Sequence, residues 1–126
     1  MSDAEPAARL KGKKVLIVED ETLISMLFED ILSDLACEVV GPALTIRQAM
    51  DLARAAEIDV AVLDVNVAGD PIWPVAEILA VRGIPMVFSS GYGSNGLPER
   101  WRNSPSLPKP FTFHEVAEVI DKVLEG

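Results

Sequence analysis

The sequence predicts one α/β domain, a doubly wound sheet of five parallel strands with helices on both faces. Short apolar runs such as Val15–Val18 and Val60–Leu63 are typical of strands buried on both faces. They alternate with longer segments whose apolar residues recur at helical spacing, a pattern that favours a parallel sheet. Residues 1–12 show no such periodicity, so we expect a mobile N-terminal tail followed by a single domain over residues 13–126.

The first half of the chain contains two strand–helix units. The strand Val15–Val18 precedes the helical pattern Leu23–Leu35. A second strand over Glu38–Val40 is expected to end at Gly41-Pro42, and Thr45 is a suitable N-cap for the helix that follows.

The second half begins with the strand Val60–Leu63 and an irregular loop that contains Gly69. The next helix is expected to end at Gly83, ahead of a fourth strand over Pro85–Ser89.

The chain then becomes irregular before a final helix. Glycines and prolines over residues 91–108 leave room only for a short or irregular fourth helix, near Pro98–Asn103. Thr112 and Glu115 have the spacing of a capping box at the start of the last helix.

Composition narrows the classes of function. The net charge of −9 disfavours nucleic-acid binding, because the chain offers only the small basic group Lys11, Lys13 and Lys14. No apolar run is long enough to cross a membrane. The single cysteine, Cys37, excludes an internal disulfide and fits a reducing compartment. We therefore expect a cytoplasmic protein that is a monomer or a weak dimer.

Charged residues follow the first, third and fifth strands. Glu19 and Asp20 come after the first apolar run, Asp64 comes after the third, and Lys109 precedes Pro110. The carboxyl ends of parallel strands meet at one edge of the sheet, where open α/β proteins bind ligands. Three carboxylates and one ammonium there suit a hard cation beside a carboxylate that accepts a phosphoryl group.

Each of these residues has a simpler interpretation when taken alone. Acidic residues such as Glu19 and Asp20 are favoured before any helix by the helix dipole. Asp64 could equally be a cap or a functional carboxylate. Lys109 stands between two prolines and has no evident packing role. Their occurrence in order at three strand ends favours a common site.

These motifs resemble those of the response-regulator receiver family, the phosphoacceptor domains of two-component signalling. Val-Glu19-Asp20-Glu resembles the acidic pair of that family, and Leu-Asp64-Val-Asn resembles its phosphoacceptor strand. Ser90 stands at the position of the switch hydroxyl, and Leu-Pro-Lys109-Pro-Phe resembles the lysine motif. The resemblance implies a flavodoxin-like sheet with strand order 2-1-3-4-5.

The resemblance also implies a role for each residue. Asp64 would be the phosphoacceptor, Lys109 would neutralise phosphoryl oxygens, and Ser90 would donate a hydrogen bond to them. One Mg²⁺ would be held by Asp20, Asp64, the backbone carbonyl of Asn66 and, directly or through water, Glu19. The implied partner is a histidine kinase or a histidine phosphotransfer protein. Ser89, adjacent to Ser90, would take the switch role if the strand carried a bulge.

The sequence departs from the usual receiver pattern at two places. Ala68-Gly69 stands where most receivers carry a proline, and Ser106 stands where most carry an aromatic residue, three before Lys109. The segment Phe88-Ser-Ser-Gly-Tyr-Gly93 resembles a Phe-Ala-Thr-Gly-Tyr subgroup with many single-domain members in α-proteobacterial stress signalling. Residues 91–108 are then expected to form the mobile output surface.

Three functions follow from this reasoning. The first is a stand-alone receiver that accepts a phosphoryl group, not a turnover enzyme, with output through protein binding or through draining phosphoryl groups from a kinase. The second is a pseudo-receiver that binds partners without phosphorylation. The third is an aspartate-nucleophile phosphatase, which would need an acid at position 66, where the chain has an asparagine that cannot shuttle protons.

Overall fold

The computed structural model describes residues 9–90, 97–109 and 111–125, which fold around one parallel sheet. The sheet has the order β2-β1-β3-β6-β7, so the predicted 2-1-3-4-5 order of a flavodoxin-like fold is confirmed. Its strands are β1 (Lys14–Val18), β2 (Glu38–Ala43), β3 (Val60–Asp64), β6 (Met86–Ser90) and β7 (Ser106–Pro108).

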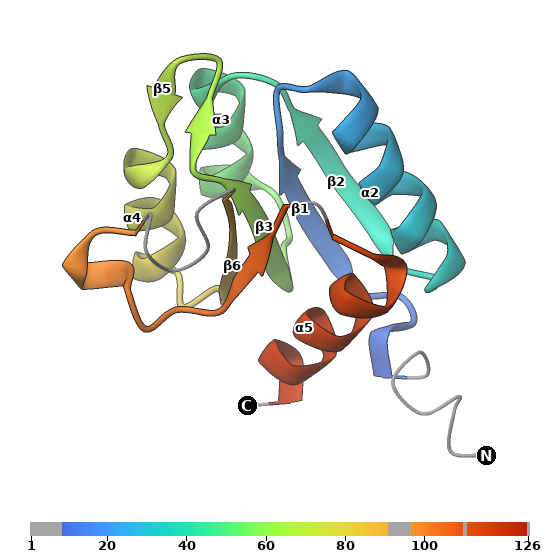
Figure 1. Cartoon of the computed structure of the whole chain (residues 1–126). Coiled ribbons are helices and arrows are strands. Elements are labelled where there is room, and N and C mark those ends of the chain that lie inside the picture. The colour runs from blue at the N-terminus through green and yellow to red at the C-terminus, as the bar shows by residue number, and fades with distance from the viewer. Residues whose placement is uncertain (1–8, 91–96, 110, 126) are drawn as a thin grey trace.

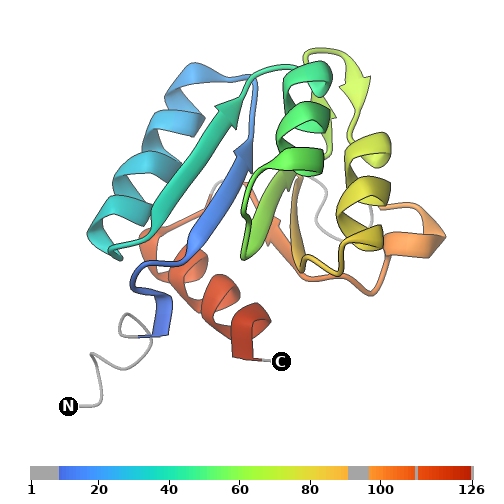
Figure 2. The ribbon, with the colours of Figure 1, turned by 180° about the vertical axis from the view of Figure 1, so that it is seen from behind.

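Helices cover both faces of this sheet, as predicted (Figures 1 and 2). The apolar cluster on one face includes Phe28 from α2 (Thr22–Asp34) and Ile120 from α5 (Phe113–Glu125). The cluster on the other face is built by α3 (Ile46–Ala55) and α4 (Trp73–Val81). The central strand β3 is buried along its whole length between the two clusters.

Both predicted helix caps are present. The Thr45 hydroxyl accepts a hydrogen bond from the Gln48 amide at 3.1 Å. At the start of α5, the Thr112 amide donates to Glu115 Oε1 at 2.9 Å, and the Glu115 amide donates to Thr112 Oγ1 at 3.1 Å. These reciprocal bonds satisfy amides that a helix start leaves without intrahelical partners.

The second strand is longer than predicted. β2 continues through Gly41-Pro42 to Ala43, and its pairing with β1 shifts register between Leu16 and Val18. An edge strand tolerates proline because one side of its backbone has no strand partner. Gly41 has a φ of 94°, and a Cβ there would lie 2.7 Å from the Ala43 amide nitrogen, so the position requires glycine.

The loop after β3 is more regular than predicted. It forms a small antiparallel hairpin from β4 (Asn66–Val67) and β5 (Asp70–Pro71). The turn between the two strands has left-handed backbone at Ala68 and Gly69, with φ of 52° and 90°. The hairpin therefore begins two residues after Asp64.

The described part of the connection between β6 and β7 contains a single turn of 3₁₀ helix, η3 (Glu99–Trp101). This agrees with the prediction of a short fourth helix near Pro98–Asn103. Trp101 is buried, and its ring centroid lies 5.7 Å from that of Phe88 in β6. Residues 91–96, which include Tyr92 and the first third of the segment 91–108 predicted to form a mobile output surface, lie outside the described residues.

The folded domain begins earlier than predicted. Leu10 is fully buried in the cluster between the sheet and the α2–α5 face, and the Gly12 amide donates to the Ala36 carbonyl at 2.8 Å. Arg9 Nε lies 3.4 Å from Asp121 Oδ1 of α5. The predicted boundary at residue 12 is therefore wrong for residues 9–12, whose contacts are too distant in sequence for local periodicity to reveal.

Candidate functional site

Three carboxylates converge at the carboxyl edge of the sheet. Glu19 and Asp20 directly follow β1, and Asp64 is the last residue of the neighbouring strand β3. One ligand oxygen from each of the three lies within 4.8 Å of the others. The structure thus brings together the acidic residues that the sequence placed at this edge.

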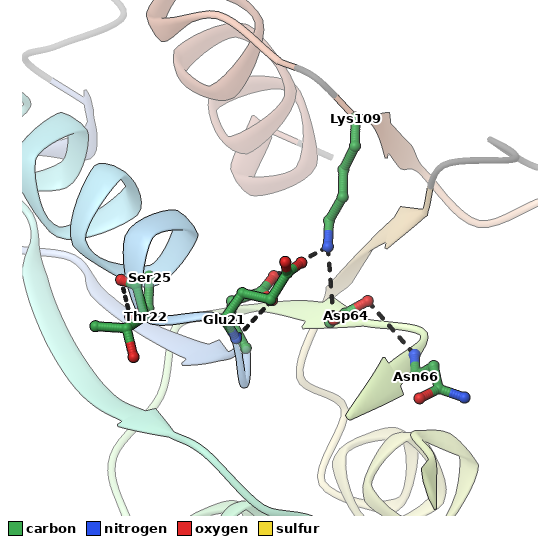
Figure 3. A network of polar contacts seen from close by, with 7 residues as sticks. Glu21, Thr22, Ser25, Asp64, Asn66 and Lys109 are labelled. Carbon is green, nitrogen blue, oxygen red and sulfur yellow. Dashed lines mark hydrogen bonds and ion pairs between the residues drawn. The ribbon is translucent and has the colours of Figure 1, made fainter. Parts of the chain in front are cut away.

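Lys109 reaches the same place from the end of β7. Its Nζ lies 3.1 Å from Glu19 Oε1 and 3.5 Å from Asp64 Oδ2 (Figure 3). The lysine is half-buried and approaches from two strands away, across β6. One ammonium therefore contacts two of the three carboxylates.

Burial dominates the electrostatics of this cluster. Glu19 is 1% exposed, and burial together with the nearby Asp64 charge raises its pKa to about 7. Burial also raises the pKa of Asp64, although the Lys109 charge opposes that shift. For Lys109, burial alone would lower the pKa, but the charges of Asp64 and Glu19 outweigh it and the pKa is raised.

Backbone amides help to hold two of the carboxylates. The Glu21 amide donates to Glu19 Oε2 at 3.2 Å, and the Asn66 amide approaches Asp64 Oδ1 at 3.4 Å. These contacts come from the residues two positions further along, where the chain turns after each strand. They orient the carboxylates toward Lys109.

The Asn66 side chain has a role that sequence reasoning missed. Its Oδ1 accepts a hydrogen bond from the Gly69 amide at 3.1 Å, and the side chain is directed away from Lys109 (Figure 3). Asn66 thereby closes the turn of the hairpin that follows Asp64. The spacing Asn-x-x-Gly was the available signal, because asparagine side chains commonly bond to backbone amides in turns.

The two candidate switch serines lie on opposite faces at the end of β6. Ser89 is the register partner of Asp64, and Ser90 is one residue further along. Val87 packs in the α2–α5 cluster and Phe88 in the α3–α4 cluster, so alternation places Ser89 with the former and Ser90 with the latter. The Ser89 hydroxyl is buried and has no hydrogen-bond partner. The strand thus separates the environments of the two hydroxyls.

The chemistry of the donor set suits a hard divalent cation. The three clustered side chains offer only oxygen ligands, which is the preference of Mg²⁺. A metal ion would also relieve the repulsion between Asp64 and Glu19 that raises the Glu19 pKa.

The fold and the sequence are similar to those of known proteins. The chain is 42% identical to SdrG from Sphingomonas melonis Fr1, whose solution structure it matches with a TM-score of 0.80 over 90% of this chain and 97% of that one. A second structure of SdrG, from Pseudomonas melonis Fr1 and described as a BeF3-activated conformation, matches with a TM-score of 0.76 at 43% identity over 88% and 95% of the two chains.

A third structure carries a family description. The chain is 30% identical to the PhyR response regulator REC domain of Erythrobacter litoralis, with a TM-score of 0.80 and 93% of each chain covered. The chain belongs to the response-regulator receiver family.

Curated relatives of this receiver domain include longer regulators. The transcriptional regulatory protein PdtaR of Mycobacterium tuberculosis is 32% identical over 124 residues, which are 95% of this chain and 59% of PdtaR. The receiver domain therefore spans little more than half the length of the first curated relatives it matches. No protein-family model matches the chain. Among the described residues, no helix has the length and hydropathy needed to span a bilayer.

Proposed function

We propose that this receiver domain accepts a phosphoryl group on Asp64 from the phosphohistidine of a histidine kinase or histidine phosphotransfer protein. The observation that supports this most strongly is the contact of Lys109 Nζ with both Glu19 and Asp64, at 3.1 and 3.5 Å, beside the third carboxylate. A nucleophilic carboxylate needs neighbouring positive charge when three phosphoryl oxygens arrive.

The reaction is a displacement at phosphorus. An Asp64 carboxylate oxygen attacks, the new O–P bond forms, and the P–N bond to the partner histidine breaks. The histidine leaves as imidazole and takes its proton from solvent. Lys109 Nζ donates hydrogen bonds to the transferred phosphoryl oxygens and shifts from Asp64 toward them.

Mg²⁺ fits the residues beside Asp64. Asp20 and Asp64 would supply side-chain oxygens, Asn66 its backbone carbonyl, and Glu19 an oxygen directly or through water. When bound, the metal supplies positive charge for the phosphoryl oxygens. The hydrogen bond from the Gly69 amide to Asn66 Oδ1 restrains Asn66, whose backbone carbonyl would be one of the Mg²⁺ ligands.

The output of the domain follows from a change at β6. We assign the switch hydroxyl to Ser90, which would bond to a phosphoryl oxygen and draw the end of β6 toward Asp64. The similarity to SdrG over 97% of that chain supports a signalling role for the receiver domain itself. Signalling would then proceed by binding a protein or by draining phosphoryl groups from a kinase, consistent with the Phe-Ala-Thr-Gly-Tyr-like subgroup.

Two other functions are less well supported. A pseudo-receiver would not need Glu19, Asp20, Asp64 and Lys109 to converge. A phosphatase would need an acid near Asp64 to move protons, but residue 66 is an asparagine whose side chain is bonded to the Gly69 amide.

The first test is the intact mass of the protein after incubation with acetyl phosphate, with and without Mg²⁺, for wild type and Asp64→Asn. We expect a Mg²⁺-dependent gain of one phosphoryl group in wild type and none in the variant, because the amide is not a nucleophile. The same incubation with a phosphohistidine-bearing kinase tests the natural donor.

Two outcomes would contradict the proposal. Undiminished labelling of Asp64→Asn would mean that another residue is the acceptor. Absence of labelling in wild type with both donors would favour the pseudo-receiver, and steady release of phosphate from a phosphomonoester would favour the phosphatase.

A further inference from the structure

The Ser89 hydroxyl is a buried polar group that has no partner in the unphosphorylated domain. Ser89 is 1% exposed, and among the described residues none forms a hydrogen bond with its Oγ. Ser25, the buried serine of α2, instead donates from its hydroxyl to the Thr22 carbonyl at 3.0 Å. A buried hydroxyl without a partner costs free energy, and an alanine would fit the same strand position without that cost. The unphosphorylated domain thus gains no stability from this hydroxyl.

The position of Ser89 in the sheet places it beside Asp64. The two residues are register partners on the neighbouring strands β3 and β6, and the Val65 amide donates to the Ser89 carbonyl at 3.2 Å. Val62 and Val87, two residues earlier in each strand, both pack in the α2–α5 cluster. Because side chains alternate along a strand, Asp64 and Ser89 lie on this same face of the sheet.

The Lys109 side chain crosses the end of β6 to reach the carboxylates. Lys109 follows β7, the strand on the other side of β6, where Leu107 is the register partner of Ser89 and packs in the same α2–α5 cluster. The Lys109 Nζ nevertheless reaches β3 and lies 3.5 Å from Asp64 Oδ2 (Figure 3). Ser89 therefore lies between the strand that carries the lysine and the carboxylate that its ammonium contacts.

The ammonium of Lys109 has three N–H donors, so it can make one contact more than its two carboxylate contacts. In the unphosphorylated domain, it lies 3.1 Å from Glu19 Oε1 and 3.5 Å from Asp64 Oδ2. When a phosphoryl group occupies Asp64, the ammonium shifts from that carboxylate toward the phosphoryl oxygens. A hydrogen bond to the Ser89 hydroxyl would then restrain the ammonium, and hydrogen bonds from charged donors are stronger than those between neutral groups.

We propose that Ser89 is a positioning residue for phosphoryl transfer: in the phosphorylated domain its Oγ accepts a hydrogen bond from Lys109 Nζ and holds the ammonium against the phosphoryl oxygens. This inference rests on the proposed function of Asp64 and adds a residue to that site. The role differs from that of the switch hydroxyl, because Ser90 lies on the opposite face of β6 and would bond to the phosphoryl group itself. Ser89 thus sets how tightly the phosphoryl group is held.

The test measures the affinity of the full chain for beryllofluoride, an analogue of a phosphoryl group on a carboxylate, in the presence of Mg²⁺. Ser89→Ala should weaken the affinity by about tenfold, the effect of losing one hydrogen bond to a charged group. Ser89→Cys has a similar volume but only a weak hydrogen-bonding group, so it should behave like Ser89→Ala. Ser89→Thr keeps the hydroxyl and should bind like wild type. Amide spectra of ¹⁵N-labelled protein follow each titration, and at saturation Ser89→Ala should reach the same spectral change as wild type.

Two measurements distinguish the positioning of Lys109 from a merely structural role of Ser89. In a Lys109→Gln background, Ser89→Ala should have no further effect on the affinity, because the ammonium that Ser89 positions is absent. In proteins that keep Lys109, its ¹⁵Nζ signal should differ between wild type and Ser89→Ala only when beryllofluoride is bound. If Lys109→Gln does not bind the analogue, the ¹⁵Nζ signal still decides.

Several results would overturn the proposal. If wild type is labelled on Asp64 but binds beryllofluoride no more tightly than Ser89→Ala does, the role of Ser89 is wrong and the proposed function stands. An effect of Ser89→Ala that persists in the Lys109→Gln background would show that Ser89 does not act through the lysine. A ¹⁵Nζ signal of Lys109 that is the same in both analogue-bound proteins would also contradict the bond. Failure of wild type to accept a phosphoryl group from either donor would overturn the proposed function and this inference together.

Discussion

At the scale of single residues, Glu19 shows how burial sets the charge of the site. Its carboxylate is 1% exposed, lies 3.1 Å from Lys109 Nζ, and still has a pKa raised to about 7. Desolvation and the Asp64 charge thus outweigh the attraction of one lysine. The carboxylates of Glu19 and Asp64 repel each other, and a bound cation would reduce this repulsion.

This repulsion predicts a pH dependence of stability in the absence of metal. The folded-state pKa of Glu19, about 7, lies above its ordinary value of 4.5, so the folded state binds the proton more tightly than the unfolded state. The contribution of Glu19 to the free energy of unfolding should therefore be most favourable below pH 4.5. As the pH rises to 7, this contribution should fall by on the order of a few kcal/mol. Urea unfolding at pH 5 and pH 8 in EDTA measures the loss.

Glu19→Gln is the matched control for this effect. The variant should lose less stability than wild type between pH 5 and pH 8, since its side chain does not ionise. An identical pH dependence in the two proteins would show that Glu19 is not the titrating group.

Ser89 and Ser90 differ in environment although they are neighbours. Ser90→Ala should still be phosphorylated but should lose the conformational response, because the bond from its hydroxyl to a phosphoryl oxygen cannot form. Ser89→Ala should keep that response and should be neutral or stabilising by up to about 1 kcal/mol, since it removes a buried hydroxyl without a partner. Amide spectra with beryllofluoride and urea unfolding measure the two effects.

The reverse pattern would change the assignment. If Ser89→Ala abolished the response and Ser90→Ala kept it, the switch hydroxyl would be that of Ser89.

At the scale of elements, the described part of the connection between β6 and β7 contains the short turn η3, which is anchored by aromatic contacts. Trp101 packs on Phe88, which in turn lies 5.7 Å from Trp73 of α4. The guanidinium carbon of Arg100 lies 4.7 Å from the centre of the Trp101 ring. Nη1 of the same arginine lies 2.7 Å from Glu77 Oε2 of α4. η3 is thereby tied both to α4 and to the strand that carries Ser90.

Trp101→Ala should therefore destabilise the domain strongly. Removal of a buried aromatic side chain costs about 3 to 5 kcal/mol, and Trp101 is 8% exposed. Trp101→Phe should cost less because it keeps a ring against Phe88. Urea unfolding measures both, and an unchanged midpoint for Trp101→Ala would show that η3 is not anchored by this ring.

At the scale of the whole molecule, the two ends of the described chain meet. Leu10 is fully buried in the same cluster as Val116 and Ile120 of α5, and the Leu10 carbonyl accepts a hydrogen bond from the Cys37 thiol at 3.4 Å. The turn before β1 therefore stabilises the last helix.

Leu10→Ala should reduce the free energy of unfolding by about 2 to 5 kcal/mol, the usual cost of removing a buried leucine side chain. Deletion of residues 1–12 should destabilise the domain at least as much as Leu10→Ala does, because it removes the same buried side chain and the hydrogen bond from the Gly12 amide to the Ala36 carbonyl. Thermal unfolding compares both variants with the wild type. Unchanged stability of the deletion variant would support a domain boundary at residue 12.

The sequence by itself determined the sheet, the helices and the meeting of the charged residues. Strands that are buried on both faces are apolar throughout, so β1 and β3 can be recognised in the sequence as continuous runs of apolar residues. Parallel strands end at one edge, so Glu19, Asp64 and Lys109 had to lie near one another once the strand order was known.

Only the tertiary structure decided the features that depend on contacts between distant residues. Burial of Leu10 depends on α5, and the raised pKa of Glu19 depends on Asp64 and on the buried strand end. The extension of β2 to Ala43 depends on pairing with β1. Local periodicity carries no information on such contacts, because packing and desolvation are set by neighbours in space.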